Sequence, residues 1–168
     1  ELGRLRASGY GPFFMMRNIR STARFRGARH DMLESVAFTF TGSVQYEILQ
    51  PLDDTPSSYR EFLERHPAGG LHHIAYWCAD FDQALRMAAR RGHDFDIVQE
   101  FIDPDGKAFE IYVEPRGSRD PLYVQLMING VYGDFFDRMQ AAAAAWDGKQ
   151  LMLEAFDYLP AHMRPPIE

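Results

Sequence analysis

The sequence has few of the features that mark several large protein classes. Its single cysteine, Cys78, excludes an intrachain disulfide and a thiolate metal cluster, and it fits a protein of the reducing cytosol. No apolar run approaches the roughly 18 residues that a membrane-spanning helix needs. The net charge of −6 lacks the basic excess of a general nucleic-acid or anionic-membrane binder. We therefore expect a cytoplasmic protein that binds neither nucleic acid nor membrane.

The composition, with 46% hydrophobic and 25% charged residues, is that of a globular protein. A length of 168 residues allows one ordinary domain or two fused small modules. The chain begins at Glu1 without an initiator methionine, and residues 1–8 resemble the end of a helix that stops at Gly9. We therefore expect that upstream residues are missing from this sequence.

Hydrophobic patterning divides the first half of the chain into short elements. These elements are a strand at 13–16, an arginine-rich loop at 17–30, a hairpin of strands 35–41 and 44–50, and a helix at 57–66. Ser57 is placed to cap that helix. The first half thus contains three strands in succession and ends with a helix.

The second half is patterned more clearly, in the order strand, helix, strand, strand, strand. These elements cover residues 71–78, 80–91, 95–102, 107–113 and 123–128, and a last helix follows at 131–146. The first half repeats this order except that its opening strand is lacking. We predict an α+β fold with a repeated βαβββ unit, divided into an N-terminal module 1–66, a C-terminal module 67–129, and a helix and tail 130–168 within one structural domain.

Glu47 lies in the middle of the predicted strand 44–50. Side chains alternate between the two faces of a strand, so Glu47 shares a face with Gln45 and Leu49. A carboxylate buried between apolar neighbours needs a partner. Alternatively, this face is exposed to solvent, as on many antiparallel sheets. The pattern alone leaves both interpretations open.

His73 shares a face of strand 71–78 with Trp77, and the same alternation places His72 on the other face. If a helical layer covers the His72 face, then His73 opens onto the opposite, concave side. Neutral imidazole is the commonest metal ligand in proteins. Two adjacent histidines are nevertheless more often one core residue beside one surface residue.

Gln125 is a polar residue in an apolar strand, where it shares a face with Tyr123 and Met127. A buried amide needs hydrogen bonds or a ligand, and hydrogen bonds to neighbouring side chains are the simpler interpretation. In the preceding strand, alternation places Glu110 and Tyr112 opposite the apolar residues. For Glu110 the pattern favours a solvated strand residue over a functional one.

Two blocks in this order, Tyr46-Glu-Ile-Leu-Gln-Pro51 and Gly69-Gly-Leu-His-His-Ile-Ala75, resemble the methylmalonyl-CoA epimerase branch of the vicinal oxygen chelate superfamily. This superfamily also includes glyoxalases and bleomycin resistance proteins. The segments 82–86 and 135–148 are similar to bacterial glyoxalase-family proteins. The resemblance extends over residues 9–148. It implies paired βαβββ modules that form a cup-shaped mixed sheet, and a homodimer.

The resemblance also implies four metal positions, on the first and last strand of each module. Carried over by position, Glu47, His73 and Gln125 would bind a divalent ion such as Zn²⁺, Co²⁺, Ni²⁺ or Mn²⁺. The fourth position falls on the strand that the sequence lacks. The family's last ligand is usually a glutamate, whereas Gln125 can coordinate through its carbonyl oxygen but cannot act as a base.

By this resemblance, the function is a metal-dependent epimerase, isomerase or lyase that acts on a small carbonyl compound through a metal-stabilised enolate. Glu47 and Glu110 are the candidate catalytic bases. The substrate pocket would be lined by Gln45, Trp77, Tyr112, Tyr123 and Met127. Five arginines within residues 17–29 could meet a substrate carboxylate or phosphate, or could simply be solvated.

Two other functions compete with this hypothesis. A metal-free module that sequesters an aromatic or drug-like molecule is favoured by Gln125 and the absent first ligand, but disfavoured by the presence of Glu47 and His73. An extradiol dioxygenase needs an iron site with two histidines and one carboxylate. Gln125 stands where that carboxylate should be and argues against the dioxygenase.

Overall fold

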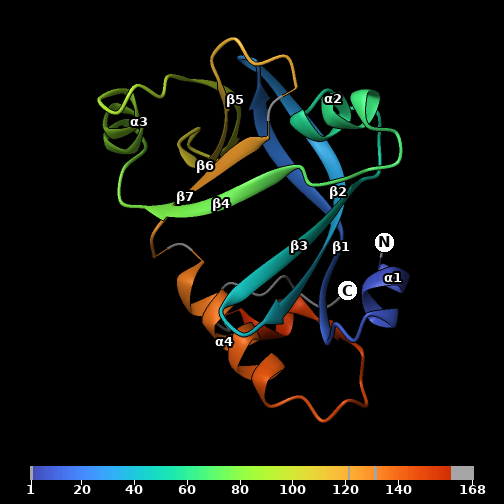
Figure 1. Ribbon diagram of the computed structural model, residues 1–168. Helices are drawn as coiled ribbons and strands as arrows, with labels where there is room; N and C mark the ends of the chain where they lie inside the picture. The colour runs from blue at the N-terminus through green and yellow to red at the C-terminus, as the bar shows by residue number, and fades with distance from the viewer. Residues whose placement is uncertain (1, 121, 131, 160–168) are drawn as a thin grey trace. The chain divides into compact units, whose positions relative to one another are not determined.

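The computed structural model describes residues 2–120, 122–130 and 132–159, and Figure 1 shows their arrangement into an α+β chain. Its elements in order are α1 (Leu2–Ala7), β1 (Phe13–Phe25), β2 (Ala28–Thr41), β3 (Val44–Pro51), α2 (Ser58–Arg65), β4 (His73–Cys78), α3 (Phe81–Ala89), β5 (Phe95–Ile102), β6 (Ala108–Pro115), β7 (Tyr123–Ile128), α4 (Gly133–Ala144), β8 (Met152–Glu154) and the 3₁₀ helix η1 (Ala155–Tyr158). Hydrogen bonds join the strands in the order β3-β2-β1-β5-β6-β7-β4, and β8 pairs with β1.

The chain divides into two compact units. The first unit comprises residues 1–19, 34–52 and 132–168, and the second comprises residues 20–33 and 53–131. The long strands β1 and β2 contribute to both units. The division into modules at residue 67 stays a prediction.

The second unit contains the predicted order strand, helix, strand, strand, strand as β4, α3, β5, β6 and β7, which confirms that part of the sequence analysis. Strand β4 pairs with β7 in parallel, whereas β5, β6 and β7 are antiparallel. Ile111, Val113 and Leu126 form a buried cluster against Phe81 and Leu85 of α3. We call the side of the sheet that carries this cluster the α3 face.

The opposite side of the second unit's sheet carries larger polar and aromatic side chains, and helix α2 packs against it. Tyr59 of α2 contacts Tyr112 of β6 edge to face, with ring centroids 5.7 Å apart. The backbone N–H of Ser58 donates to Oε1 of Gln99 on β5 at 2.9 Å. We call this side the α2 face.

The first unit also buries both sides of its strands. Phe14, Val36 and Phe38 pack against Phe135 and Met139 of α4, and we call this side the α4 face. On the other side, a second cluster of strand residues meets the short helix α1 through Leu2 and Leu5. Strands β2 and β3 form the predicted hairpin around Gly42, whose backbone φ is 61°.

The prediction of a loop at residues 17–30 is wrong. Strand β1 continues to Phe25 and β2 already starts at Ala28, so only a tight turn separates them. Arg26 and Gly27 make this turn with φ values of 46° and 84°. Exposed arginines interrupt the apolar pattern along both strands, which removes the signal that sequence analysis uses to detect a strand.

The C-terminal part agrees with the prediction only in its helix. The predicted helix 131–146 is α4, although Val131 lies outside the described residues. The sequence predicts only a tail after this helix, yet Met152–Glu154 form β8 and pair in parallel with the start of β1. Residues 160–168 of that tail lie outside the described residues.

Ser57 caps α2 as predicted, because its side-chain oxygen accepts a hydrogen bond from the backbone N–H of Arg60 at 3.2 Å. We expect Ser57→Ala to lower the free energy of unfolding by about 1 kcal/mol, since one buried donor of the first turn loses its partner. Urea denaturation measures this loss. Ser118→Ala, on an exposed turn, is the matched control and should leave the unfolding midpoint unchanged. Equal midpoints for the two variants would contradict the assigned cap.

Candidate functional site

Strand register brings several of the predicted site residues onto the α2 face of the second unit. On β6 and β7, Tyr112 pairs with Gln125 and Glu110 pairs with Met127. On β4, His73 is the register partner of Tyr123. Paired residues of neighbouring strands point to the same side of a sheet, so these side chains form one surface.

The amide of Gln125 is a buried polar group of this surface, with 2% of the residue exposed. Its Nε2 donates to Oε1 of Glu110 at 2.7 Å and to the hydroxyl of Tyr112 at 2.9 Å. Its Oε1 has no hydrogen-bond partner among the described residues. A buried carbonyl oxygen without a donor is costly, so this atom is the natural acceptor for a ligand.

His73 lies at the start of β4, half-buried, with its ring edge-on to Tyr112 at 5.2 Å between centroids. Its Nδ1 is 3.0 Å from Nδ1 of His72. Alternation predicted that His72 faces the other way, but the His72 ring contacts Tyr112 and Tyr123 of the α2 face. The alternation rule fails at His72 because the strand starts only at His73.

His72 is half-buried among aromatic rings, which also include Tyr59 and Phe62 of α2. Burial is the main cause that lowers its pKa to about 3, and the neighbouring His73 lowers it further. His72 is therefore neutral at physiological pH. Its Nδ1 contact with His73 restricts the orientation of that ring.

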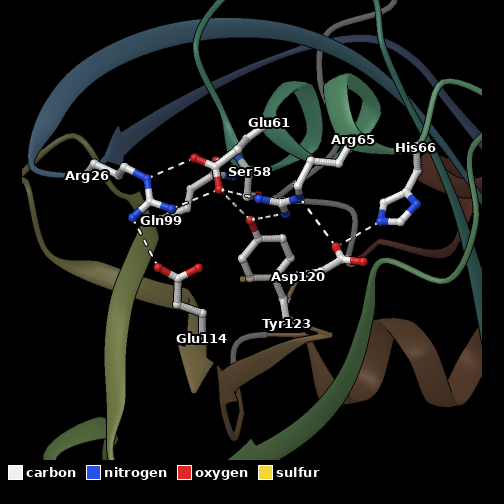
Figure 2. A network of polar contacts seen from close by, with 9 residues as sticks. All are labelled: Arg26, Ser58, Glu61, Arg65, His66, Gln99, Glu114, Asp120 and Tyr123. Atoms are coloured by element: carbon white, nitrogen blue, oxygen red, sulfur yellow. Dashed lines mark hydrogen bonds and ion pairs between the residues drawn. The ribbon is translucent and has the colours of Figure 1, made fainter. Parts of the chain in front are cut away.

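A network of charged side chains ties α2 to the same sheet, and Figure 2 shows Glu61 at its centre between Arg26 and Arg65. The guanidinium of Arg26 contacts both oxygens of Glu61, at 2.9 and 2.8 Å. Tyr123 donates its hydroxyl to Oε1 of Glu61 at 2.8 Å. The hydrogen bond from Arg26 is the largest cause that lowers the pKa of Glu61 to about 2. Burial is the main cause that raises the pKa of Tyr123 to about 12.

Three of the five arginines proposed as substrate contacts make ion pairs within the chain. Arg17 pairs with Glu154 in the first unit. Arg24 contacts Glu100 at 3.8 Å and the carbonyl oxygen of Gly106 at 2.9 Å. Arg26 also contacts Glu114 at 3.1 Å. These contacts support a structural role for the three side chains.

Sequence reasoning missed the part that α2 plays in this site. The sequence pattern places Tyr59 and Glu61 in the predicted helix 57–66 and indicates no role for them in the site. Their importance depends on which strand residues they meet across a long sequence separation. The only signal in the sequence is that an aromatic and a charged residue, Tyr59 and Glu61, lie two positions apart on one helix.

Glu47 and Gln45 lie in the first unit, on β3. Their register partners on β2 are Phe38 and Phe40, which belong to the apolar cluster beside α4. Glu47 is half-buried there, so its carboxylate is neither fully solvated nor in a dry core. Mid-strand placement on a largely apolar face was the reason for selecting this residue.

The predicted pocket residues of the second unit differ in their accessibility. Tyr112, Tyr123 and Met127 are buried, whereas Trp77 is 43% exposed. A hollow in this unit lies beside α2, lined by residues that include Phe25, Pro56 and Arg60, and none of the predicted site residues lines it. The predicted site residues on the α2 face and the hollow beside α2 are therefore separate features.

The residues present fit a divalent cation in their chemistry. The imidazole of His73 and the amide oxygen of Gln125, both in the second unit, are donors that such ions accept. No three His, Cys, Asp or Glu side chains cluster at metal-binding spacing within the part of the chain that the structure describes. The predicted ligand set contains only two residues of those types. Oε1 of Gln125 supplies a buried acceptor that suits a cation.

The model of the glyoxalase/bleomycin resistance protein/dioxygenase superfamily matches residues 9–108. The chain belongs to this superfamily. This match confirms the resemblance and the α+β glyoxalase-like fold. No curated protein matches the chain. Among the described residues, no helix is long and apolar enough to cross a membrane.

The superfamily includes many enzymes, and many of its members use divalent metals. Membership alone does not decide the reaction, the metal ion or the oligomeric state of this chain. The roles of Glu47, His73, Glu110 and Gln125 therefore stay predictions, as do the homodimer and the cytoplasmic location.

The depressed pKa of Glu61 predicts how stability changes with acidity. The ordinary value is 4.5 and the folded value is about 2. A carboxyl with a lowered folded pKa contributes stability above its unfolded pKa and loses it as the pH falls through the folded one. We expect the wild-type melting temperature to fall more steeply between pH 4.5 and pH 2 than that of Glu61→Gln.

Thermal melts across this pH range, followed by circular dichroism, make the comparison. Glu64→Gln alters an exposed carboxylate on the same helix and should follow the wild-type curve. Parallel curves for wild type and Glu61→Gln would show that the network contributes no stability through Glu61.

Proposed function

We propose that the protein is a metal-dependent epimerase, isomerase or lyase that moves a proton next to the carbonyl group of a small compound. The observation that supports this most is the pair His73 and Gln125 on the α2 face. The buried Oε1 of Gln125 has no hydrogen-bond partner among the described residues. Superfamily membership supports the same reaction class.

In this proposal His73 and Gln125 of the second unit bind a divalent cation, and Glu47 stays a ligand that only the sequence resemblance suggests. When bound, the cation supplies Lewis-acid polarisation of the substrate carbonyl. His72 is neutral, holds the His73 ring through the contact between their Nδ1 atoms, and adds no positive charge near the cation. Hydrogen bonds to the other ring nitrogen commonly orient histidine ligands in this way.

Proton transfer needs a base within hydrogen-bond reach of the substrate. Of the two predicted bases, Glu110 accepts a hydrogen bond from the Gln125 amide at 2.7 Å. This contact engages one oxygen of Glu110 in holding Gln125. Glu47 stays the other base that the sequence resemblance suggests, and the exchange experiment below distinguishes the two. Trp77, which is exposed, would contact the apolar part of the substrate.

A metal-free binding module is the second candidate. The amide of Gln125 in place of a carboxylate favours it, because an amide is a weaker ligand for a divalent ion. The exposed ring of Trp77 also favours it, since an aromatic molecule could stack on that ring. The two functions differ in whether ligand binding needs a metal ion.

Isothermal titration with Zn²⁺, Co²⁺, Ni²⁺ and Mn²⁺ tests the proposed metal site. We expect at least one ion to bind in a one-to-one ratio, and we expect His73→Ala to weaken that binding by about tenfold or more, because an imidazole ligand is lost. His93→Ala removes an exposed histidine after α3 and is the matched control. Failure of all four ions to bind would refute the metal-dependent function and leave the binding module.

The reaction class is tested with a methylmalonyl thioester in D₂O, since the sequence resembles the epimerase branch. In the presence of the bound ion, mass spectrometry should detect deuterium at the carbon between the carbonyl groups faster than the uncatalysed exchange. Loss of a base costs about 10²- to 10⁴-fold, so Glu47→Gln should slow exchange on this scale. Exchange that survives in Glu47→Gln but disappears in Glu110→Gln would assign the base to Glu110.

A further inference from the structure

We propose that Glu110 is a positioning residue that fixes the amide of Gln125 so that its carbonyl oxygen is presented to a cation. This inference rests on the proposed metal-dependent function only in naming a cation as the group that Oε1 of Gln125 binds. The superfamily usually carries a carboxylate where this chain has Gln125, and here the carboxylate of Glu110 lies on the neighbouring strand β6.

The contacts of Gln125 determine which end of the amide faces the neighbouring strand. A carboxylate accepts hydrogen bonds and donates none, so the atom 2.7 Å from Oε1 of Glu110 must be the amide nitrogen. The second contact, to the Tyr112 hydroxyl at 2.9 Å, uses the other N–H of the same nitrogen. With both N–H groups engaged, Oε1 points away from Glu110 and Tyr112.

Tyr112 is itself held in place by α2. The Tyr59 hydroxyl donates to the Tyr112 hydroxyl at 3.1 Å, and both rings are buried. Hydrogen bonds therefore extend from the helix through Tyr112 to the amide. Rotation of the amide by 180° would bring its oxygen against the Glu110 carboxylate and lose this bond, so the observed orientation is strongly favoured.

This arrangement has a chemical consequence for the ligand. The hydrogen bond to an ionised carboxylate polarises the amide and increases the electron density on Oε1. A carbonyl oxygen so polarised is a better ligand for a divalent cation than an isolated amide. Through this contact Glu110 would also add one negative charge to the surroundings of a cation bound by Oε1 of Gln125.

The pairing is tested by exchanging the two side chains. Gln125→Glu alone places two carboxylates face to face at hydrogen-bond distance and should lower the melting temperature by several degrees. The double variant Gln125→Glu with Glu110→Gln restores one donor and one acceptor and should recover most of that loss. Additive effects of the two substitutions would overturn the proposed pairing. This measurement needs no metal, so it stays valid if the proposed function fails.

Metal affinity provides the readout that a merely structural role would not change. For folded protein at 20 °C, we expect Glu110→Ala to weaken binding of the preferred ion about tenfold, because the amide is no longer oriented. Glu110→Gln keeps an acceptor for Nε2 and should retain more affinity than Glu110→Ala. Glu64→Ala, on an exposed part of α2, is the control and should bind as wild type does.

Two results would overturn the positioning role. The first is wild-type metal affinity in Glu110→Ala. The second is equal weakening by Glu110→Ala and Glu110→Gln together with a normal melting temperature, which indicates that only the charge of Glu110 acts. If wild-type protein binds none of the four ions, the proposed function fails, and the melting temperatures of the exchange variants still decide whether Glu110 fixes Gln125.

Discussion

The second unit is organised by the need to satisfy polar side chains that are buried between a helix and a sheet. Helix α2 covers strand residues that include Gln99, Tyr112 and Tyr123, and each of these meets a polar group of the helix. A buried polar group without a partner costs about 1–3 kcal/mol, so these three matched contacts favour one placement of the helix on the sheet. That matching places the helix, and the helix in turn holds Tyr112 against Gln125.

Alternation along the strands explains why one sheet can be both a core and a site. On β6, Ile111 and Val113 pack beneath α3, while the intervening Tyr112 points to α2. The same rule applied to the sequence separated Glu110 and Tyr112 from their apolar neighbours. Strands β4 to β7 and the start of α3 at Asp80 were therefore predictable, because they depend on local residue pattern and on a capping side chain.

What could not be predicted depends on contacts between distant residues. The arginine-rich segment was interpreted as a loop because charged side chains hide the strand pattern, yet Arg26 meets Glu61 and Glu114 across 35 and 88 residues of sequence. His72 was assigned to the wrong face because alternation gives no information before a strand begins. Glu110 was interpreted as a solvated residue, because nothing in its own strand indicates that the Gln125 amide of the neighbouring strand donates a hydrogen bond to it.

The Gln125 amide connects the superfamily resemblance with what is particular to this chain. A carboxylate at that position would bring its own charge to a cation, but it would also face Glu110 at hydrogen-bond distance, and two adjacent carboxylates repel each other. An amide avoids this repulsion, because its nitrogen satisfies Glu110 and its oxygen remains an acceptor. Glutamine on β7 and glutamate on β6 are thus a compatible pair, because the amide donates the hydrogen bond that the carboxylate accepts.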